Sequence, residues 1–195
     1  PGGPLLHLPE HGTAIGLKLF DVLFDHGIDD VHVFKILPEK GRRKQRKEIK
    51  MKIATIGAGN IGGTLGTLWA RGGHEVMFSS RHPEQLEQLT RSAGDKACRG
   101  SYEQAAAFGE AVLLAIPLHG ISETLPRIQL YLQDKLVIDA MNFFENRDSG
   151  LGGEVEEFGG LSSSLVASRL PESPLVKAFN CVPAADLRGQ AHRKG

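Results

Sequence analysis

The sequence predicts a doubly wound α/β fold built on a parallel sheet. From residue 51 onward, segments with strand patterns alternate with segments with helix patterns, and a glycine-rich turn joins the first strand to the first helix. The predicted strand 111–116 is continuously apolar, which is typical of a strand buried on both faces of a parallel sheet, and 136–140 is predicted to be another buried strand. In such a sheet, ligands bind outside the carboxyl ends of the strands, where the strand order reverses.

The composition is that of a folded domain with no overall charge. The chain has 195 residues, of which 41% are hydrophobic and 24% are charged, so it is long enough to bury a core. Because 23 lysines and arginines balance 23 aspartates and glutamates, nucleic acid is not an expected partner. No apolar run approaches the length of about 18 residues that a membrane helix needs, so no membrane partner is predicted. Cys98 and Cys181 make neither a disulfide framework nor a zinc site, and we expect a cytoplasmic protein without a metal.

Residues 1–50 are predicted to be an N-terminal extension of unknown role. A helix is expected over 14–26 and a strand over 31–37, and together they are too small to form a core. The segment 40–52 is strongly basic, with Glu48 as its only acid. It is either a solvated linker or a patch for nucleic acid or a membrane surface, and the lack of interleaved aromatic residues favours the linker.

The predicted domain boundaries follow from where the alternation of strand and helix patterns begins and ends. The sequence starts at Pro1 without a methionine, and Met51 opens the first convincing strand, so we expect the functional domain to begin there. We predict a folded domain over 51–189 and a tail over 190–195.

A glycine motif follows the predicted strand 52–56 and leads into the predicted helix 64–71. Its residues are Gly57, Ala58, Gly59, Asn60, Ile61 and Gly62. A G-x-G-x-x-G pattern between a strand and a helix predicts the dinucleotide-binding turn of a Rossmann fold. Gly57 would permit the tight turn, Gly59 would let the backbone approach a pyrophosphate, and Gly62 would let helix and strand pack closely. The helix N-terminus adds N–H donors and partial positive charge. The alternative is a glycine-rich turn that holds no ligand.

The residues after the second predicted strand, 75–80, indicate which dinucleotide would bind. Dinucleotide folds specific for NAD place a carboxylate here, about 20 residues beyond the glycines, to accept from the ribose hydroxyls. This chain instead has Ser79, Ser80 and Arg81. Hydroxyls and a guanidinium bind a 2′-phosphate through charge-assisted hydrogen bonds, so the sequence predicts NADP(H) as the cofactor. The alternative for Arg81 is an exposed loop arginine.

The alternation continues to the end of the predicted domain. Strands are expected over 96–100, 111–116, 136–140 and 175–179, and helices over 83–93, 102–108, 120–132 with an interruption at Pro126, and 161–170. The segment 149–160 is predicted to be a glycine-rich loop.

Residues at the predicted strand ends are candidates for the nicotinamide side of the site. Ile116 and Pro117 would supply an apolar surface, and Asn142 and Asn180 would supply hydrogen bonds. No catalytic residue is assigned; His119 and Asn180 are candidates, and His119 would act as a general acid. Hydride transfer between two cofactors depends above all on positioning, so an acid–base set is not essential.

These motifs together resemble the NADP oxidoreductases that work with coenzyme F420, a deazaflavin. The resemblance covers about 51–189 and is carried by the stretch from MKIATIGAGNIGG to SSRHPEQL, by VLLAIPLHGI and LVIDAMN, and by LVKAFNCVPAADL. It implies a Rossmann NADP-binding domain that carries hydride between NADPH and the deazaflavin. By matching position, NADP would be held by Gly57, Ala58, Gly59, Asn60, Ile61, Gly62, Ser80 and Arg81, with Ile116, Pro117, Asn142 and Asn180 around the nicotinamide.

The chain also departs from the family pattern. Phe143 follows Asn142 where the family commonly has proline, and the small C-terminal substrate region expected after the sixth strand does not follow before Gly195. The resemblance further implies a homodimer. Two function classes remain: an enzyme that reduces a deazaflavin, a flavin or a small imine, and an NADP(H)-binding redox sensor without catalysis.

Overall fold

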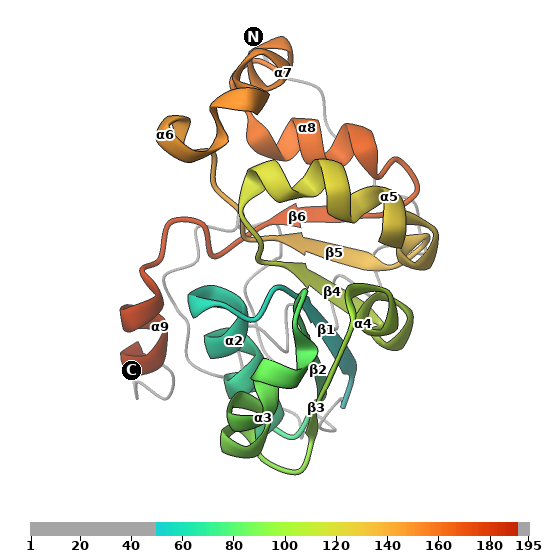
Figure 1. The fold of residues 1–195 in the computed structure, drawn as a ribbon, viewed down its shortest axis with the longest axis vertical. Coiled ribbons are helices and arrows are strands. Elements are labelled where there is room, and N and C mark those ends of the chain that lie inside the picture. The colour runs from blue at the N-terminus through green and yellow to red at the C-terminus, as the bar shows by residue number, and fades with distance from the viewer. Residues whose placement is uncertain (1–49, 191–195) are drawn as a thin grey trace, which may run out of the picture.

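The computed structural model describes residues 50–190, with side chains up to Leu187 (Figure 1). The helix predicted over 14–26, the strand predicted over 31–37 and nearly all of the basic segment 40–52 lie outside the described residues.

Six parallel strands form one sheet in the order β3-β2-β1-β4-β5-β6, which confirms the doubly wound α/β prediction. The strands are β1 (Lys52–Ile56), β2 (Glu75–Ser79), β3 (Ala97–Gly100), β4 (Ala111–Leu114), β5 (Leu136–Asp139) and β6 (Leu175–Lys177). The chain builds outward from β1 to β3 and then crosses back to place β4 on the other side of β1, so the strand order reverses between β1 and β4. This reversal is where a ligand crevice is expected.

Helices connect the strands and cover both faces of the sheet (Figure 1). The α-helices are α2 (Asn60–Arg71), α3 (Glu87–Ala93), α4 (Tyr102–Phe108), α5 (Ile121–Leu132), α6 (Glu145–Asp148), α7 (Gly152–Glu157), α8 (Ser162–Arg169) and α9 (Ala184–Gln190). Short 3₁₀ turns η1 (Pro83–Leu86), η2 (Leu118–Gly120) and η3 (Ser149–Leu151) precede α3, α5 and α7. Among residues 50–190, no helix is both long and apolar enough to cross a bilayer.

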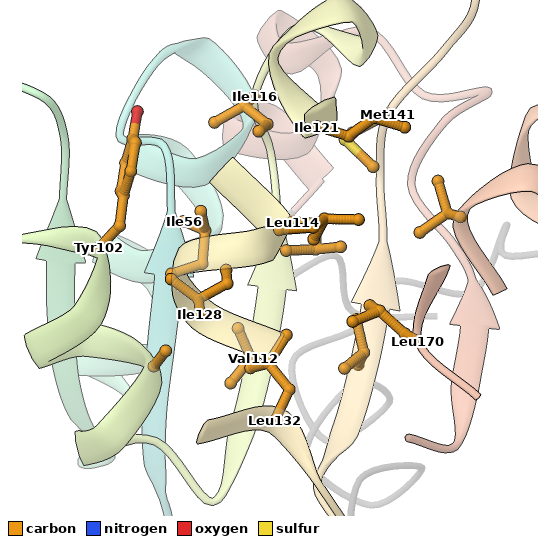
Figure 2. Close-up of a cluster of buried hydrophobic side chains, with 14 of the residues drawn as sticks. Ile56, Tyr102, Val112, Leu114, Ile116, Ile121, Ile128, Leu132, Met141 and Leu170 are labelled. Atoms are coloured by element: carbon orange, nitrogen blue, oxygen red, sulfur yellow. The ribbon is translucent and has the colours of Figure 1, made fainter. Parts of the chain in front are cut away.

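Two layers of buried side chains explain why these elements stack as they do. Neighbouring residues of each strand point to opposite faces, so Ile53 packs with α2, α3 and α9, whereas Ala54 and Ile56 pack with α4, α5 and α8. Figure 2 shows the second layer, in which Val112 and Leu114 of β4 lie beneath α5. All four residues of β4 are buried, as the apolar run predicted.

The structure corrects the predictions in three places. The segment 149–160 is not a loop, because η3 and α7 form within it, with Leu151 and Val155 buried against the second layer. Helix α5 runs through Pro126 without interruption, and Pro126 lies on its exposed side. Helix α9 was not predicted; the burial of Leu187 against the first layer holds it in place.

Several strands also end earlier than predicted. Strand β4 ends at Leu114 and β6 at Lys177, so Ile116, Pro117 and Asn180 belong to the connections that follow. These connections therefore form the edge of the sheet where the site lies.

Candidate functional site

The glycine turn between β1 and α2 has the backbone geometry that its sequence predicts. Gly57 has φ of +95°, and a Cβ there would lie 2.6 Å from the carbonyl oxygen of Ala115. A Cβ on Gly62 would lie 2.0 Å from the carbonyl oxygen of Gly57, so the first turn of α2 fits only without a side chain. The turn thus presses against both its own helix and the end of β4.

Gly59 differs from the other two glycines because it faces open space. A Cβ on Gly59 would meet nothing within 4 Å, and Gly59 is exposed at the N-cap of α2 without a side-chain cap. The unused N–H groups of this helix start therefore face an open approach, which is the arrangement that binds phosphate. The space over Gly59 is what a closely approaching pyrophosphate requires.

A cavity of about 320 Å³ joins the glycine turn to the end of β2. Its lining includes Gly57, Ala58, Gly59, Ser80, Arg81, Tyr102, Ile116 and Pro117. We call it the phosphate-side cavity. The sheet brings these residues together because β2 and β4 flank β1 on either side.

Arg81 in this cavity is exposed and makes no ion pair or hydrogen bond within residues 50–190. The Ser80 hydroxyl accepts a hydrogen bond from the His82 amide at 3.0 Å and still has its own proton to donate. Ser79 is fully buried, and its hydroxyl donates to the Thr55 carbonyl oxygen at 2.6 Å, so Ser79 is not available to a ligand. The guanidinium charge and one hydroxyl are thus free for an anion.

Tyr102 of α4 is a member of the phosphate-side cavity that sequence reasoning missed. It is 8% exposed, with its hydroxyl end at the top of the second layer (Figure 2). Burial raises the pKa of Tyr102, and the nearby charge of Arg81 partly opposes this rise. Tyr102 therefore remains a neutral phenol beside the Arg81 charge. Tyr102 is far from the glycine motif along the chain, and nothing in the sequence indicated that the two would line one cavity.

A second cavity, of about 660 Å³, lies over the ends of β4, β5 and β6. Its lining includes Asn60, Ile61, Ile116, Pro117, Asn142, Phe144, Arg147, Asn180 and Cys181. We call it the nicotinamide-side cavity. Because Ile116 and Pro117 line both cavities, the two are adjacent, and between them they contain every predicted cofactor residue except the buried Gly62.

The loop after β6 is held in place within this second cavity. The Asn142 side-chain amide donates to the backbone carbonyl of Asn180 at 2.7 Å, which ties the β5 end to the β6 end. Phe179, the residue directly before Asn180, has φ of 64°, a rare conformation for a residue with a side chain. Its ring is buried and packs edge-on against Trp69 of α2, with centroids 6.4 Å apart. This packing stabilises the turn that presents Asn180.

An ion pair with a buried carboxylate lies beneath the same loop. Asp139, at the end of β5, is fully buried, and its carboxylate lies 3.0 Å from the Lys177 ammonium. Burial raises the pKa of Asp139, and Lys177 and the Met141 amide partly counteract that rise. Lys177 also donates to the Met141 carbonyl oxygen, so the pair joins β5, β6 and the segment leading to Asn142.

His119 is not in the lining of either cavity. It lies in η2, two residues beyond Pro117, and its Nδ1 is 2.8 Å from a carboxylate oxygen of Asp148. Sequence reasoning missed Asp148, Arg147 and Phe144 because α6 was not expected; the only signal was the charged Arg147–Asp148 pair after a strand end. No group of metal-ligating side chains occurs in the part of the chain that the structure describes.

Residues 52–143 match the model of a protein family described as NADP oxidoreductase, coenzyme F420-dependent. The F420-dependent NADP reductase of Methanothermobacter thermautotrophicus is 30% identical over 155 residues, which are 72% of this chain and 66% of the relative. A glycerol-3-phosphate dehydrogenase [NAD(P)+] of Shouchella clausii is 33% identical over 94 residues, covering 42% of this chain and 28% of the relative.

Solved structures share the fold. A provisionally assigned F420-dependent NADP reductase from Arthrobacter sp. FB24 superposes with a TM-score of 0.55 at 20% identity, over 69% of this chain and 65% of that structure. The chain thus spans about two thirds or less of the proteins that it matches.

The fold and the glycine turn define a Rossmann domain of the dinucleotide-binding class. With the family match, the assignment becomes specific: this chain carries a Rossmann domain of the coenzyme F420-dependent NADP oxidoreductase family.

Proposed function

We propose that this protein transfers hydride between NADPH and an organic acceptor, with the deazaflavin coenzyme F420 as the first candidate. The observation that carries the proposal is the phosphate-side cavity, in which the open glycine turn meets Arg81, unpaired within residues 50–190, and the Ser80 hydroxyl, which still has a proton to donate. The family match and the relative named as an F420-dependent NADP reductase support the choice of acceptor.

The residues present fit NADP(H). In the proposal, the open space above Gly59 and the start of α2 hold the pyrophosphate, and Ser80 and Arg81 hold the 2′-phosphate. A carboxylate at this place would repel the phosphate, and the chain has none between Ser79 and Arg81. Ala58, Asn60 and Ile61 would complete the turn around the dinucleotide.

The nicotinamide-side cavity is where the proposal places the reacting ring. Ile116 and Pro117 would lie against one face, and Asn180 and the unused oxygen of Asn142 would hydrogen-bond to polar atoms of the ring or the acceptor. Bound NADPH supplies the hydride. The protein contributes position and the exclusion of water, which are the main requirements of hydride transfer between two rings.

The cavity has the size of a site for small organic ligands, which commonly measure about 300–1,000 Å³. A flavin or a small imine is the alternative acceptor. We also propose that residues 51–189 make up the cofactor domain, and the homodimer that the resemblance implies stays a prediction.

The test is a calorimetric titration of NADPH and NADH with the wild-type protein and with Arg81→Ala. NADPH should bind at least about tenfold more tightly than NADH, a difference of about 1.4 kcal/mol, and Arg81→Ala should abolish the preference. Arg91→Ala is the matched control, because Arg91 is an exposed arginine of α3 that pairs with Glu87 and lines neither cavity.

Equal binding of the two nucleotides would overturn the phosphate assignment. The second part follows NADPH absorbance after addition of coenzyme F420, FMN or a cyclic imine. Tight NADPH binding without consumption by any acceptor would instead support the redox sensor.

A further inference from the structure

Asp148 is a fully buried carboxylate that the proposed function does not use. One of its oxygens accepts from the His119 amide at 3.1 Å and lies 2.8 Å from His119 Nδ1. The other accepts from the Phe144 amide at 3.0 Å and from Arg147 Nη2 at 2.9 Å. With so many donors around it, this carboxylate is held as an anion that can only accept hydrogen bonds.

The lowered pKa of Asp148 agrees with this geometry. Burial alone would raise its pKa, but the hydrogen bonds from Arg147, from the Phe144 amide and from His119 outweigh burial and hold the pKa far below its usual range. The partner of His119 Nδ1 is therefore ionised at neutral pH.

An ionised carboxylate at Nδ1 fixes the state of the imidazole. Nδ1 must carry a proton, which leaves Nε2 as the nitrogen that gains or loses a proton. The His119 side chain is 53% exposed, so the imidazole is not enclosed by protein. A carboxylate that orients an imidazole in this way is the arrangement that enzymes use to prepare a histidine for proton transfer.

The His119–Asp148 pair adjoins residues that line the nicotinamide-side cavity. Arg147 Nε is 3.1 Å from the Asp148 oxygen that His119 also contacts, and the Arg147 guanidinium stacks 4.8 Å from the centre of the Phe144 ring. Arg147 and Phe144 line the cavity, as does Pro117, two residues before His119. Two residues of the cavity wall, Arg147 and Phe144, therefore contact Asp148 directly, and through Asp148 they are connected to His119.

We propose that His119 donates a proton to the hydride acceptor and that Asp148 is its positioning residue. This inference rests on the proposed function and narrows its substrate class to acceptors that take up a proton with the hydride, at a nitrogen or oxygen conjugated with the carbon that is reduced. As the acceptor carbon receives the hydride and NADPH becomes NADP⁺, the π electrons of the C=N or C=O bond move to the heteroatom. That atom forms a bond to hydrogen as the Nε2–H bond of the His119 imidazolium breaks, and neutral His119 regains a proton from water.

The first experiment measures turnover of coenzyme F420 and of a cyclic imine by His119→Asn. Asparagine places an amide N–H near the position of Nδ1 and so can keep the contact with Asp148, but it cannot transfer a proton. We expect kcat to fall at least about 100-fold, with NADPH affinity and thermal stability unchanged, and free imidazole to restore part of the rate of His119→Ala. Unchanged kcat in His119→Asn would overturn the proposal and leave the hydride-transfer function standing.

The second experiment tests Asp148 and needs no turnover. Long-range ¹H–¹⁵N spectra of the wild-type protein should show neutral His119 with the proton on Nδ1, and Asp148→Asn should shift the population toward the Nε2–H tautomer. The matched control is Glu145→Gln, which changes an exposed carboxylate on the same helix, α6. A wild-type His119 with its proton on Nε2 would overturn the positioning role.

The two sets of outcomes separate this inference from the proposed function. If the wild-type protein binds NADPH but reduces no acceptor, the hydride-transfer function fails and the proton-transfer role fails with it. If it reduces an acceptor and His119→Asn does so equally well, only the proton-transfer role fails.

Discussion

Lys177 and Asp139 form an ion pair that joins the last two strands of the sheet directly beneath the nicotinamide-side cavity. The carboxylate is fully buried, whereas a quarter of the Lys177 side chain is exposed, and the two groups are 3.0 Å apart. The pair lies between β5 and β6 in the register Asp139 to Lys177, and Lys177 also reaches the Met141 carbonyl oxygen. This arrangement fixes the two strand ends that carry Asn142 and Asn180.

Replacing Lys177 by methionine should destabilise the fold by about 3 kcal/mol at pH 7, because it leaves the buried Asp139 carboxylate without its counter-ion. Without Lys177 the pKa of Asp139, already raised by burial, rises further. A raised pKa means that the folded state binds more protons than the unfolded state, so stability falls as pH increases through that range. The deficit of Lys177→Met, measured by urea unfolding, should therefore shrink as pH falls toward 4. Adding Asp139→Asn to Lys177→Met should recover part of the lost free energy of unfolding. An equal loss at every pH would show that the charge of Asp139 is not its cause.

Asp148 has the opposite dependence on pH. Its pKa is lowered in the folded state, so the stability that it contributes is present above the unfolded pKa of about 4 and is lost as pH falls below it. Asp148→Asn should cost about 3 kcal/mol in urea unfolding at pH 7, and the difference from the wild type should narrow below about pH 4. Glu145→Gln on the same helix should change stability by less than about 0.5 kcal/mol at either pH. A constant difference between pH 7 and pH 3 would show that the charge of Asp148 is not what stabilises the helix.

Gly59 and Gly62 should respond differently to alanine although both belong to one motif. A Cβ on Gly62 would overlap the Gly57 carbonyl oxygen, so Gly62→Ala should lower the free energy of unfolding by at least about 3 kcal/mol. Gly59→Ala meets open space at a helix N-cap and should cost less than about 1 kcal/mol. In calorimetry, Gly59→Ala should nevertheless weaken NADPH binding at least about tenfold, because the methyl group occupies the proposed approach of the pyrophosphate. Undiminished binding would place the pyrophosphate elsewhere.

Asn142→Asp tests the tie between the ends of β5 and β6. The substitution keeps the shape of the side chain but removes the N–H that donates to the Asn180 carbonyl, and it sets a negative charge against that oxygen. We expect a loss of about 1–3 kcal/mol in thermal or urea unfolding and weaker binding of NADPH. Asn142→Ala, which removes the donor without adding a charge, should be the milder change. A neutral result for Asn142→Asp would mean that Phe179 and Trp69 alone hold the loop.

The sequence by itself determined the sheet and the glycine turn. The continuous apolar run 111–116 is typical of a strand covered on both faces. The spacing of Gly57, Gly59 and Gly62 is dictated by contacts within a dozen residues of chain, apart from the packing against Ala115. Local rules therefore sufficed for β1, α2, β2 and the alternation that follows. The same rules predicted a loop over the glycine-rich segment 149–160, and this prediction was wrong. The burial of Leu151 and Val155 outweighs the low helix propensity of its glycines, so a helix forms there.

Only the tertiary structure decided which polar groups meet. Tyr102 lines the same cavity as Arg81 because α4 packs over β1, and Asp148 contacts His119 because α6 folds back onto the connection after β4. Asp139 and Lys177 are 38 residues apart in sequence and become partners through the register of β5 and β6. Such contacts depend on crossover connections that bring distant segments to one edge of the sheet, and no spacing along the chain encodes them. The residues proposed to hold the cofactor could therefore be named from the sequence, whereas the contact of His119 with Asp148 became visible only once the sheet was assembled.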